Sequence, residues 1–311
     1  MSDKPNFKFG EDKILKELYD YISSTYKGHY STNKFQSTEF IIDCGHGEGF
    51  MIGNVIKYAQ RYGKKNGYNR SDLLKVAHYA IMALHINSMQ TGVSDDTIEV
   101  LKNFSTINPS LSFKAGNTVR TVSEQKNILA QAEIGETLPV NFAIYELNQF
   151  LGLTSLYDKP DYSFGEREVV ISEGNNKSKY TYTDPSMVTS APDKNLQLDS
   201  IDVSVKVSAD DLKKVLMAAN QLGLPEVVIR GSGSKISLVA TDTKNPTSNE
   251  HSIEVGDTNT SFQMVFKTEN LQKLSMSEYN IEISKSGIAH FKSTEKNIQY
   301  WIATETNSTY S

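Results

Sequence analysis

Ile201-Asp-Val-Ser-Val-Lys-Val207, followed directly by Ser208-Ala-Asp-Asp211, is the stretch that decides the fold. The apolar residues of its first part alternate strictly, and this period of two predicts a half-buried strand. The serine, with an acidic residue three positions later, resembles the capping box that starts a helix. The apolar stripe expected on that helix recurs at helical spacing and consists of Leu212, Val215, Leu216 and Ala219.

The same order of elements occurs twice. After the strand and helix of the second pass, strands are expected near 226–230, 236–241, 252–255 and 262–266, a short helix at 269–274, and strands at 279–284, 288–291 and 298–303. The first pass has a short helix at 95–104, strands at 111–114, 118–123, 128–134 and 140–145, a helix at 146–151, and strands near 168–171 and 179–182. The repeat predicts two tandem α+β domains, 93–183 and 201–311, joined by an extended proline-containing connector at 184–200.

The first 92 residues lack the strand pattern and are predicted to form a small all-α domain. A first helix is indicated by apolar residues between Ile14 and Ile22, and a second runs from about 50 to 62, where Gly63 ends it. A third is expected to open at Ser71 as N-cap. The helical pattern breaks at 88–93, where Met89 stands as the start of a shorter separate product would.

Composition limits the class of protein. Of the 311 residues, 38% are hydrophobic and 22% charged, which is a globular balance. The single cysteine, Cys44, excludes a disulfide framework and a multi-cysteine zinc site. No apolar run reaches the roughly 20 residues of a membrane span, and the N-terminus lacks the layout of a signal peptide. We therefore expect a cytoplasmic protein without a membrane partner.

The charge is unevenly distributed along the chain. Residues 1–92 hold 12 Lys and Arg against 9 Asp and Glu, a net charge of +3, whereas residues 93–311 hold 20 against 28, a net charge of −8. Proteins that grip DNA through its phosphates are usually basic. The long acidic part is therefore either no DNA binder or one that holds DNA topologically, with a local basic lining.

Five sets of residues follow one another in the α+β part: Leu101-Lys-Asn-Phe-Ser-Thr-Ile-Asn108, Lys114-Ala-Gly116, Ala143-Ile-Tyr-Glu-Leu-Asn-Gln-Phe-Leu-Gly152, Asp184-Pro-Ser186, and Tyr300, Ala303, Glu305 and Ser308-Thr309. In sequence and in order they resemble the T-even-type bacteriophage DNA sliding clamps. The resemblance covers nearly all of 94–311. It implies a homotrimeric ring that encircles duplex DNA, tethers the DNA polymerase, is opened by an ATP-dependent clamp loader and works in the cytoplasm of the infected host. It also implies no catalytic residue, no cofactor and no metal.

Two sets of site residues go with this resemblance. Lys213 and Lys214 lie on the helix face opposite the apolar stripe, and with Lys102 and Lys273 they are expected to line the hole for DNA. The alternative is an ordinary solvated face. A groove for partner peptides beside the connector is expected from Met187, Val188, Leu196, Leu198 and Trp301. The alternative is that these five side chains fill the core or pack the connector.

The first 92 residues contain Gly49-Phe-Met-Ile-Gly-Asn-Val-Ile-Lys-Tyr58, followed by Arg61, Gly63 and Lys64. These residues resemble a small phage domain that is poorly characterised and sometimes labelled nucleotide-kinase-like. Asn54, Lys57 and Arg61 fall on one helical face, and Lys64 extends it, so the four together predict a phosphate or nucleotide site. A solvated basic face is the alternative. For the whole chain, the alternative function is a nucleotide-binding or kinase-like enzyme that a clamp module recruits to replication sites.

Three further observations argue against other kinds of site. Residues 1–92 contain no ordinary phosphate-binding loop. Cys44 and His46 lack further ligands at metal spacing. Gly231-Ser-Gly-Ser-Lys235 looks like a phosphate loop, but it joins two strands and is predicted to be a hairpin turn.

Overall fold

The computed structural model describes residues 7–29, 37–44, 46–65, 67–88, 90–194 and 196–311. The chain forms two compact units, Met1–Thr91 and Gly92–Ser311. Met89, the expected start of a shorter product, lies outside the described residues.

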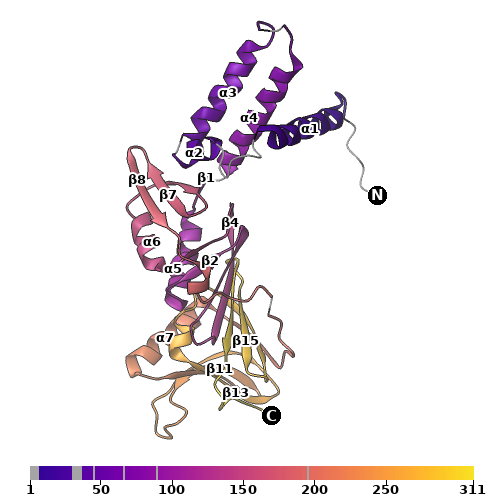
Figure 1. Ribbon diagram of the computed structural model, residues 1–311. Helices are drawn as coiled ribbons and strands as arrows, with labels where there is room; N and C mark the ends of the chain where they lie inside the picture. The colour runs from indigo at the N-terminus through magenta and orange to yellow at the C-terminus, as the bar shows by residue number, and fades with distance from the viewer. Residues whose placement is uncertain (1–6, 30–36, 45, 66, 89, 195) are drawn as a thin grey trace. The chain divides into compact units, whose positions relative to one another are not determined.

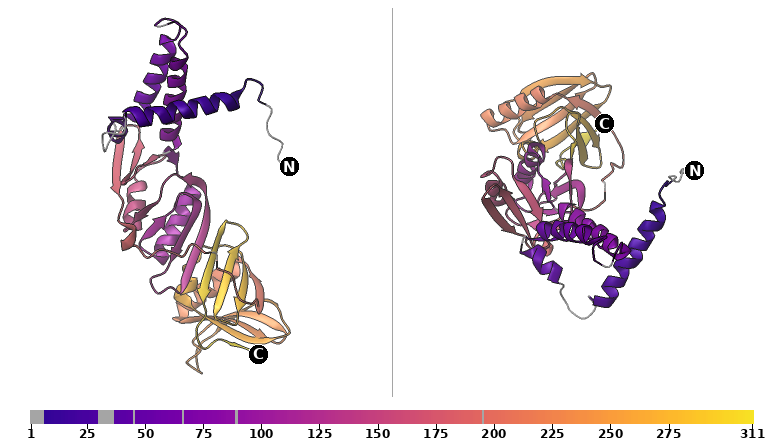
Figure 2. Two further views of the ribbon diagram at one scale, coloured as in Figure 1. Left: turned by 45° about the vertical axis from the view of Figure 1, so that its right-hand side comes forward. Right: turned by 90° about the horizontal axis from the view of Figure 1, so that it is seen from above.

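The first unit is helical. Its elements are α1 (Glu11–His29), α2 (Ser37–Asp43), α3 (Gly47–Arg61) and α4 (Arg70–Ser88). Helices α3 and α4 lie side by side (Figure 1), and α1 crosses them (Figure 2, left). The sequence did not predict α2. It also placed the start of α4 two residues late, because the side chain of Asn69, and not that of Ser71, caps the helix by accepting the backbone N–H of Ser71 at 3.0 Å.

The described part of this unit has a thin apolar core. Its buried apolar side chains are Leu18 and Met51, whereas Leu15 and Leu84 are 60% and 69% exposed. Rings add some packing, since Tyr58 and Tyr79 stack with centroids 5.7 Å apart. Burial of apolar area is the dominant stabilising contribution in folding. This unit therefore has much less to stabilise it than the second unit.

We expect the helical unit to unfold before the second unit on heating. Because few of its apolar side chains leave water, its transition should lie at least about 5 °C lower, the shift that about 1 kcal/mol produces in a domain of this size. Differential scanning calorimetry of the full chain should show two transitions, and residues 93–311 alone should keep the upper one. A single unfolding transition of the full chain, at the same temperature by calorimetry and by every optical probe, would contradict this expectation.

The second unit contains two halves with the same order of elements. The first half consists of α5 (Asp95–Ile107), β2 (Leu111–Phe113), β3 (Gly116–Val122), β4 (Ile128–Leu138), β5 (Phe142–Ile144), α6 (Leu147–Thr154), β6 (Asp161–Phe164), β7 (Glu168–Glu173) and β8 (Asn176–Thr181). The second half consists of α7 (Ala209–Leu222), β10 (Glu226–Ser232), β11 (Lys235–Thr241), β12 (His251–Asp257), β13 (Ser261–Lys267), α8 (Thr268–Leu271), β14 (Tyr279–Ser284), β15 (Ile288–Ser293) and β16 (Ile298–Ala303).

Three strands and one turn complete the chain. Strand β1 (Gln90–Gly92) precedes the first half, β9 (Val203–Val207) precedes the second, and β17 (Thr309–Tyr310) ends it. The 3-10 turn η1 (Pro185–Met187) opens the connector. The repeat predicted from the sequence is therefore present, although β1, β6 and β17 were not predicted.

The start of the second half forms as its sequence predicts. Strand β9 alternates buried and exposed side chains along its whole length. The Ser208 hydroxyl accepts the backbone N–H of Asp211 at 3.1 Å, and the stripe from Leu212 to Ala219 is buried. Gly223 ends α7 in the left-handed region, at φ 65°. Strands β10 and β11 pair as a hairpin, so the Gly231–Lys235 stretch is a turn as predicted.

A single sheet joins the two halves. Its strand order is β3-β4-β16-β15-β14-β9, so strands of the first half continue directly into those of the second. The junction is the antiparallel pair β4 and β16, which aligns Ile128 with Ile302 and Ala130 with Tyr300. Side chains reinforce it, since Asn103 of α5 donates to the carbonyl of Lys273 at 2.8 Å and Lys296 pairs with Glu99 at 2.6 Å.

Candidate functional site

The outer face of α7 presents two adjacent lysines. Lys213 and Lys214 are exposed, on the face opposite the buried stripe, and Met217 beside them is 56% exposed. Lys214 also lines a small hollow between α7 and β12 with Asp211, Met217, His251 and Ile253. The structure therefore leaves both lysines available to an anionic partner, with Lys214 closer to the edge of the sheet.

The first half has a matching lysine on α5. Lys102 is exposed, and the next residue, Asn103, donates to the carbonyl of Lys273. The sequence placed Lys273 inside a short helix, but α8 ends at Leu271 and Lys273 lies half-buried in the turn that follows. The fold thus brings Lys273 next to α5.

The five expected groove residues do not share one environment. Met187 is 63% exposed and Leu196 37%, and Leu198 is half-buried. Val188 and Trp301 are only 7% and 6% exposed, and the Trp301 ring stacks on His290 with centroids 4.7 Å apart. Val188 and Trp301 therefore pack the interior and do not present a groove surface, because neighbouring side chains cover them.

The connector is fixed to the first half. Asp193 is ion-paired with Lys114, and Arg120 donates to the carbonyl of Pro192 at 3.2 Å. The ammonium of Lys114 holds the pKa of the Asp193 carboxyl below its ordinary value. Exposed apolar side chains at Met187 and Leu196 thus belong to a segment with defined anchors.

Two edge strands of the second unit carry exposed side chains of opposite charge. Strand β8 is the last strand in the order β6-β7-β8 and exposes Lys177 and Lys179. Strand β12 begins the order β12-β11-β10-β13-β17 and exposes Glu254 and Asp257. An edge strand offers unpaired N–H and C=O groups to another chain.

The predicted phosphate site of the helical unit is partly occupied by internal contacts. Arg61 is ion-paired with Asp72, whose side chain is buried, and its Nε also donates to Asp72 Oδ1 at 3.0 Å. These hydrogen bonds hold the pKa of Asp72 below its ordinary value. Asn54 is 8% exposed, donates to the carbonyl of Phe50 at 2.9 Å and accepts from Lys57 at 3.3 Å.

Cations nevertheless gather around one ring in this unit. The Tyr58 ring has Arg61 Cζ at 4.6 Å, Lys57 Nζ at 4.7 Å and Lys75 Nζ at 5.0 Å from its centroid. Lys57 and Lys64 are exposed. Of the four predicted residues, these two are free of the Asp72 contact and face water. Lys75 is not among the four predicted residues, because it lies on α4 and its sequence position does not show that it approaches Tyr58.

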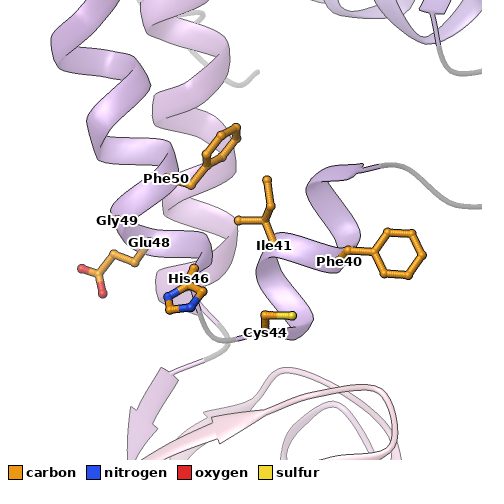
Figure 3. Close-up of a pocket in the computed structure, with 7 residues that line it drawn as sticks. All are labelled: Phe40, Ile41, Cys44, His46, Glu48, Gly49 and Phe50. Carbon is orange, nitrogen blue, oxygen red and sulfur yellow. The ribbon is translucent and has the colours of Figure 1, made fainter.

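An open hollow of about 700 Å³ lies between α2 and α3, lined by Phe40, Ile41, Cys44, His46, Glu48, Gly49 and Phe50. Figure 3 shows Glu48 pointing away from the Cys44 thiol and the His46 ring. Within the described ranges, no group of three or more His, Cys, Asp or Glu residues is placed to hold a metal ion. In those same ranges, no helix combines the length and the apolarity that a membrane crossing requires.

Comparison with solved structures defines the class of fold. The chain matches PCNA of Thermococcus kodakaraensis with a TM-score of 0.53 at 13% identity, covering 70% of this chain and 99% of that one. It matches the β subunit of DNA polymerase III from Borrelia burgdorferi with a TM-score of 0.54 at 14% identity, covering 70% and 64%. The second unit thus has the sliding-clamp fold.

Sequence comparison defines the family. A model described as DNA polymerase processivity factor matches residues 94–190, and one described as gp45 sliding clamp, C terminal, matches 202–306. The sliding clamp of Vibrio phage KVP40 is 33% identical over 68% of this chain and 98% of its own length, and that of Enterobacteria phage T4 is 28% identical over 70% and 98%. The chain belongs to the T4-type phage sliding clamps, which are DNA polymerase processivity factors and not enzymes.

The helical unit matches a different model. Residues 24–81 correspond to a family described as a protein of unknown function, DUF3310. The clamp relatives align over about 220 residues, the length of the second unit, so they leave the helical unit unmatched. The helical unit is an addition to a clamp.

Proposed function

We propose that three copies of the chain close into a ring around duplex DNA, with β8 of one copy paired to β12 of the next. The observation that carries this proposal is the internal repeat. By order along the chain, β4 corresponds to β12 and β16 to β8. The pair β4 and β16 already joins the halves of one chain. Pairing β12 with β8 of a neighbour would repeat that junction and generate a head-to-tail assembly that can close.

Charge and burial on the two edges support this pairing. The lysines exposed on β8, Lys177 and Lys179, would meet the acids exposed on β12, Glu254 and Asp257. The half-buried Ile253 and Val255 alternate with the exposed positions of β12, as on a strand with one covered face. Opposite charges on neighbouring strands stabilise the pair.

A ring of three copies has a direct test. We expect light scattering to give three times the chain mass, both for the full chain and for residues 93–311 alone, because both edges belong to the second unit. The measurement should span micromolar to nanomolar concentrations. A truncated chain that stays monomeric at micromolar concentration would remove the ring from the second unit.

The ring would tether a polymerase to its template. A polymerase bound to a ring rebinds at high effective concentration after each brief dissociation. The ring is expected to act in the cytoplasm of the infected bacterial host, to need an ATP-dependent loader for opening, and to hold DNA beside Lys102, Lys213, Lys214 and Lys273. Lysines are exposed on α5 and α7 although the total charge of the second unit is negative. This local positive charge supports placing the two helices beside the DNA phosphates.

Partners are proposed to dock beside the connector. Met187, Leu196 and Leu198 offer apolar surface there, whereas Val188 and Trp301 are buried. One similar solved structure is the C-terminal region of FEN-1 bound to the PCNA of A. fulgidus, at a TM-score of 0.55. By analogy, a short segment of the phage polymerase would occupy this surface.

For the helical unit we propose phosphate binding, centred on the cations around Tyr58. Lys57 and Lys64 face water, and Lys57 and Lys75 both approach the Tyr58 ring, at 4.7 and 5.0 Å from its centroid, so these two lysines could share an anion. Arg61 and Asn54 act as supports in this arrangement, since their polar groups contact Asp72, Lys57 and Phe50.

A further inference from the structure

The turn between α3 and α4 combines exposed cations with an exposed aromatic ring. Residues 61–70 contain no acidic residue and four cations, namely Arg61, Lys64, Lys65 and Arg70. Lys64 and Lys65 are exposed, and 82% of Tyr68 is accessible. We infer that this turn binds single-stranded DNA, with phosphates on the lysines and one base stacked on Tyr68. The inference specifies the ligand class for the phosphate-binding role proposed above and rests on it.

Tyr68 is held in position although it is exposed. Gly63 adopts φ 80°, and its N–H donates to the carbonyl of Gly67 at 3.1 Å. A Cβ atom at Gly63 would lie 3.2 Å from Tyr68 Cε1, so the ring rests against the glycine backbone. The Tyr62 ring meets Tyr68 edge-on, with centroids 5.4 Å apart. A ring fixed in this way loses little conformational freedom when a base stacks on it.

The turn itself is ordered by backbone hydrogen bonds. The N–H groups of Lys64 and Lys65 both donate to the carbonyl of Arg61, at 3.0 and 3.2 Å. At the other end, Arg70 is fixed by two hydrogen bonds to Glu17, at 2.7 and 2.6 Å. The two lysines therefore extend from a defined backbone, next to the Tyr68 ring.

Positive charge continues from the turn along the helices. Lys57 lies one helical turn before Arg61, roughly 6 Å along the axis, and Lys75 approaches the same Tyr58 ring from α4. The carboxylate that contacts Arg61, Asp72, is buried, and its charge is used in that ion pair. Cations spread over α3, the turn and α4 suit a chain of phosphates better than one phosphate.

The exposed Tyr68 ring favours single-stranded over duplex nucleic acid. A base can stack on a side chain only where it is not stacked in a duplex, and combining aromatic platforms with basic tracks is the usual way to bind single strands. No aliphatic residue occurs within 61–70, so the turn lacks the apolar anchors that are typical of protein contacts. Attached to a clamp, the turn would hold the exposed template strand at high effective concentration.

The test is fluorescence anisotropy of the full chain with a labelled short oligothymidylate. Tyr68→Ala should weaken binding about tenfold, the order of one lost base stack. Lys64→Ala with Lys65→Ala should lower the slope of log affinity against log salt by about 1.4, since each phosphate contact on a single strand contributes about 0.7. Both changes are at exposed positions and should leave the helical circular dichroism signal unchanged.

The matched control lies on α1. Lys13→Ala with Lys16→Ala, and Tyr19→Ala, remove the same chemistry from exposed positions elsewhere in the helical unit, and we expect unchanged affinity. Equal losses in the control and turn variants, or no binding of oligothymidylate, would overturn the single-strand inference. Competition by thymidine monophosphate at the oligonucleotide's own molar concentration would also overturn it, yet would leave the phosphate site standing.

Discussion

The variant Lys177→Glu with Lys179→Glu is expected to be a monomer at concentrations where the wild-type chain is a trimer. The change places acids on β8 opposite Glu254 and Asp257 of β12 in the proposed junction. Juxtaposed like charges cost several kcal/mol at an interface, so each junction should weaken about 10²- to 10³-fold. Light scattering over a concentration series measures the shift.

A charge swap provides the control for this experiment. Combining the two β8 changes with Glu254→Lys and Asp257→Lys on β12 restores opposite charges across the junction and should restore the trimer. The swap also turns the internal ion pairs Lys179–Glu168 and Lys235–Asp257 into like-charge pairs, but interactions between exposed charges of this kind change folding stability little. If the β8 variant dissociates no more readily than the wild type, β8 is not the edge that joins the copies.

The second large effect is expected from Lys213→Glu with Lys214→Glu on α7. Each chain changes by four charge units and a ring of three chains by twelve. If both lysines face the hole, that charge lies within about a Debye length, ~10 Å, of the DNA phosphates. Primer extension with polymerase and loader should then give product lengths reduced on the order of tenfold at low salt.

Two controls separate DNA contact from assembly. Lys244→Glu with Lys292→Glu makes the same charge change at exposed positions outside α7 and should leave product length nearly unchanged. Because Lys214 also lines the hollow next to β12, the trimer mass of the α7 variant has to be checked. A normal trimer with normal product length at low and moderate salt would place both lysines outside the hole.

Local features of this fold could be predicted because they depend on neighbouring residues. The alternation in β9 and the Ser208 cap both concern residues within a few positions of one another. Pairing between β4 and β16 could not be predicted in this way, since it joins residues about 170 positions apart. Neither strand's sequence indicates which strand it pairs with. Short elements such as β6 and β17 are also too brief to show a period.

The candidate sites show the same limit. Exposure of Lys213 and Lys214 follows from helical spacing, because the opposite face is strongly apolar. Spacing alone did not reveal that Arg61 would be ion-paired with Asp72, which lies on a different helix. Apolar character likewise could not distinguish Met187, which is exposed, from Trp301, which is buried.

The sheet shared by both halves makes the second unit stiff. Buried side chains of the two halves belong to one apolar cluster, so the halves cannot hinge apart at β4 and β16 without exposing that cluster to water. In the proposed ring, a force applied by a loader would deform each chain very little. The gap through which DNA enters would therefore open between copies, and each chain would move as a rigid body.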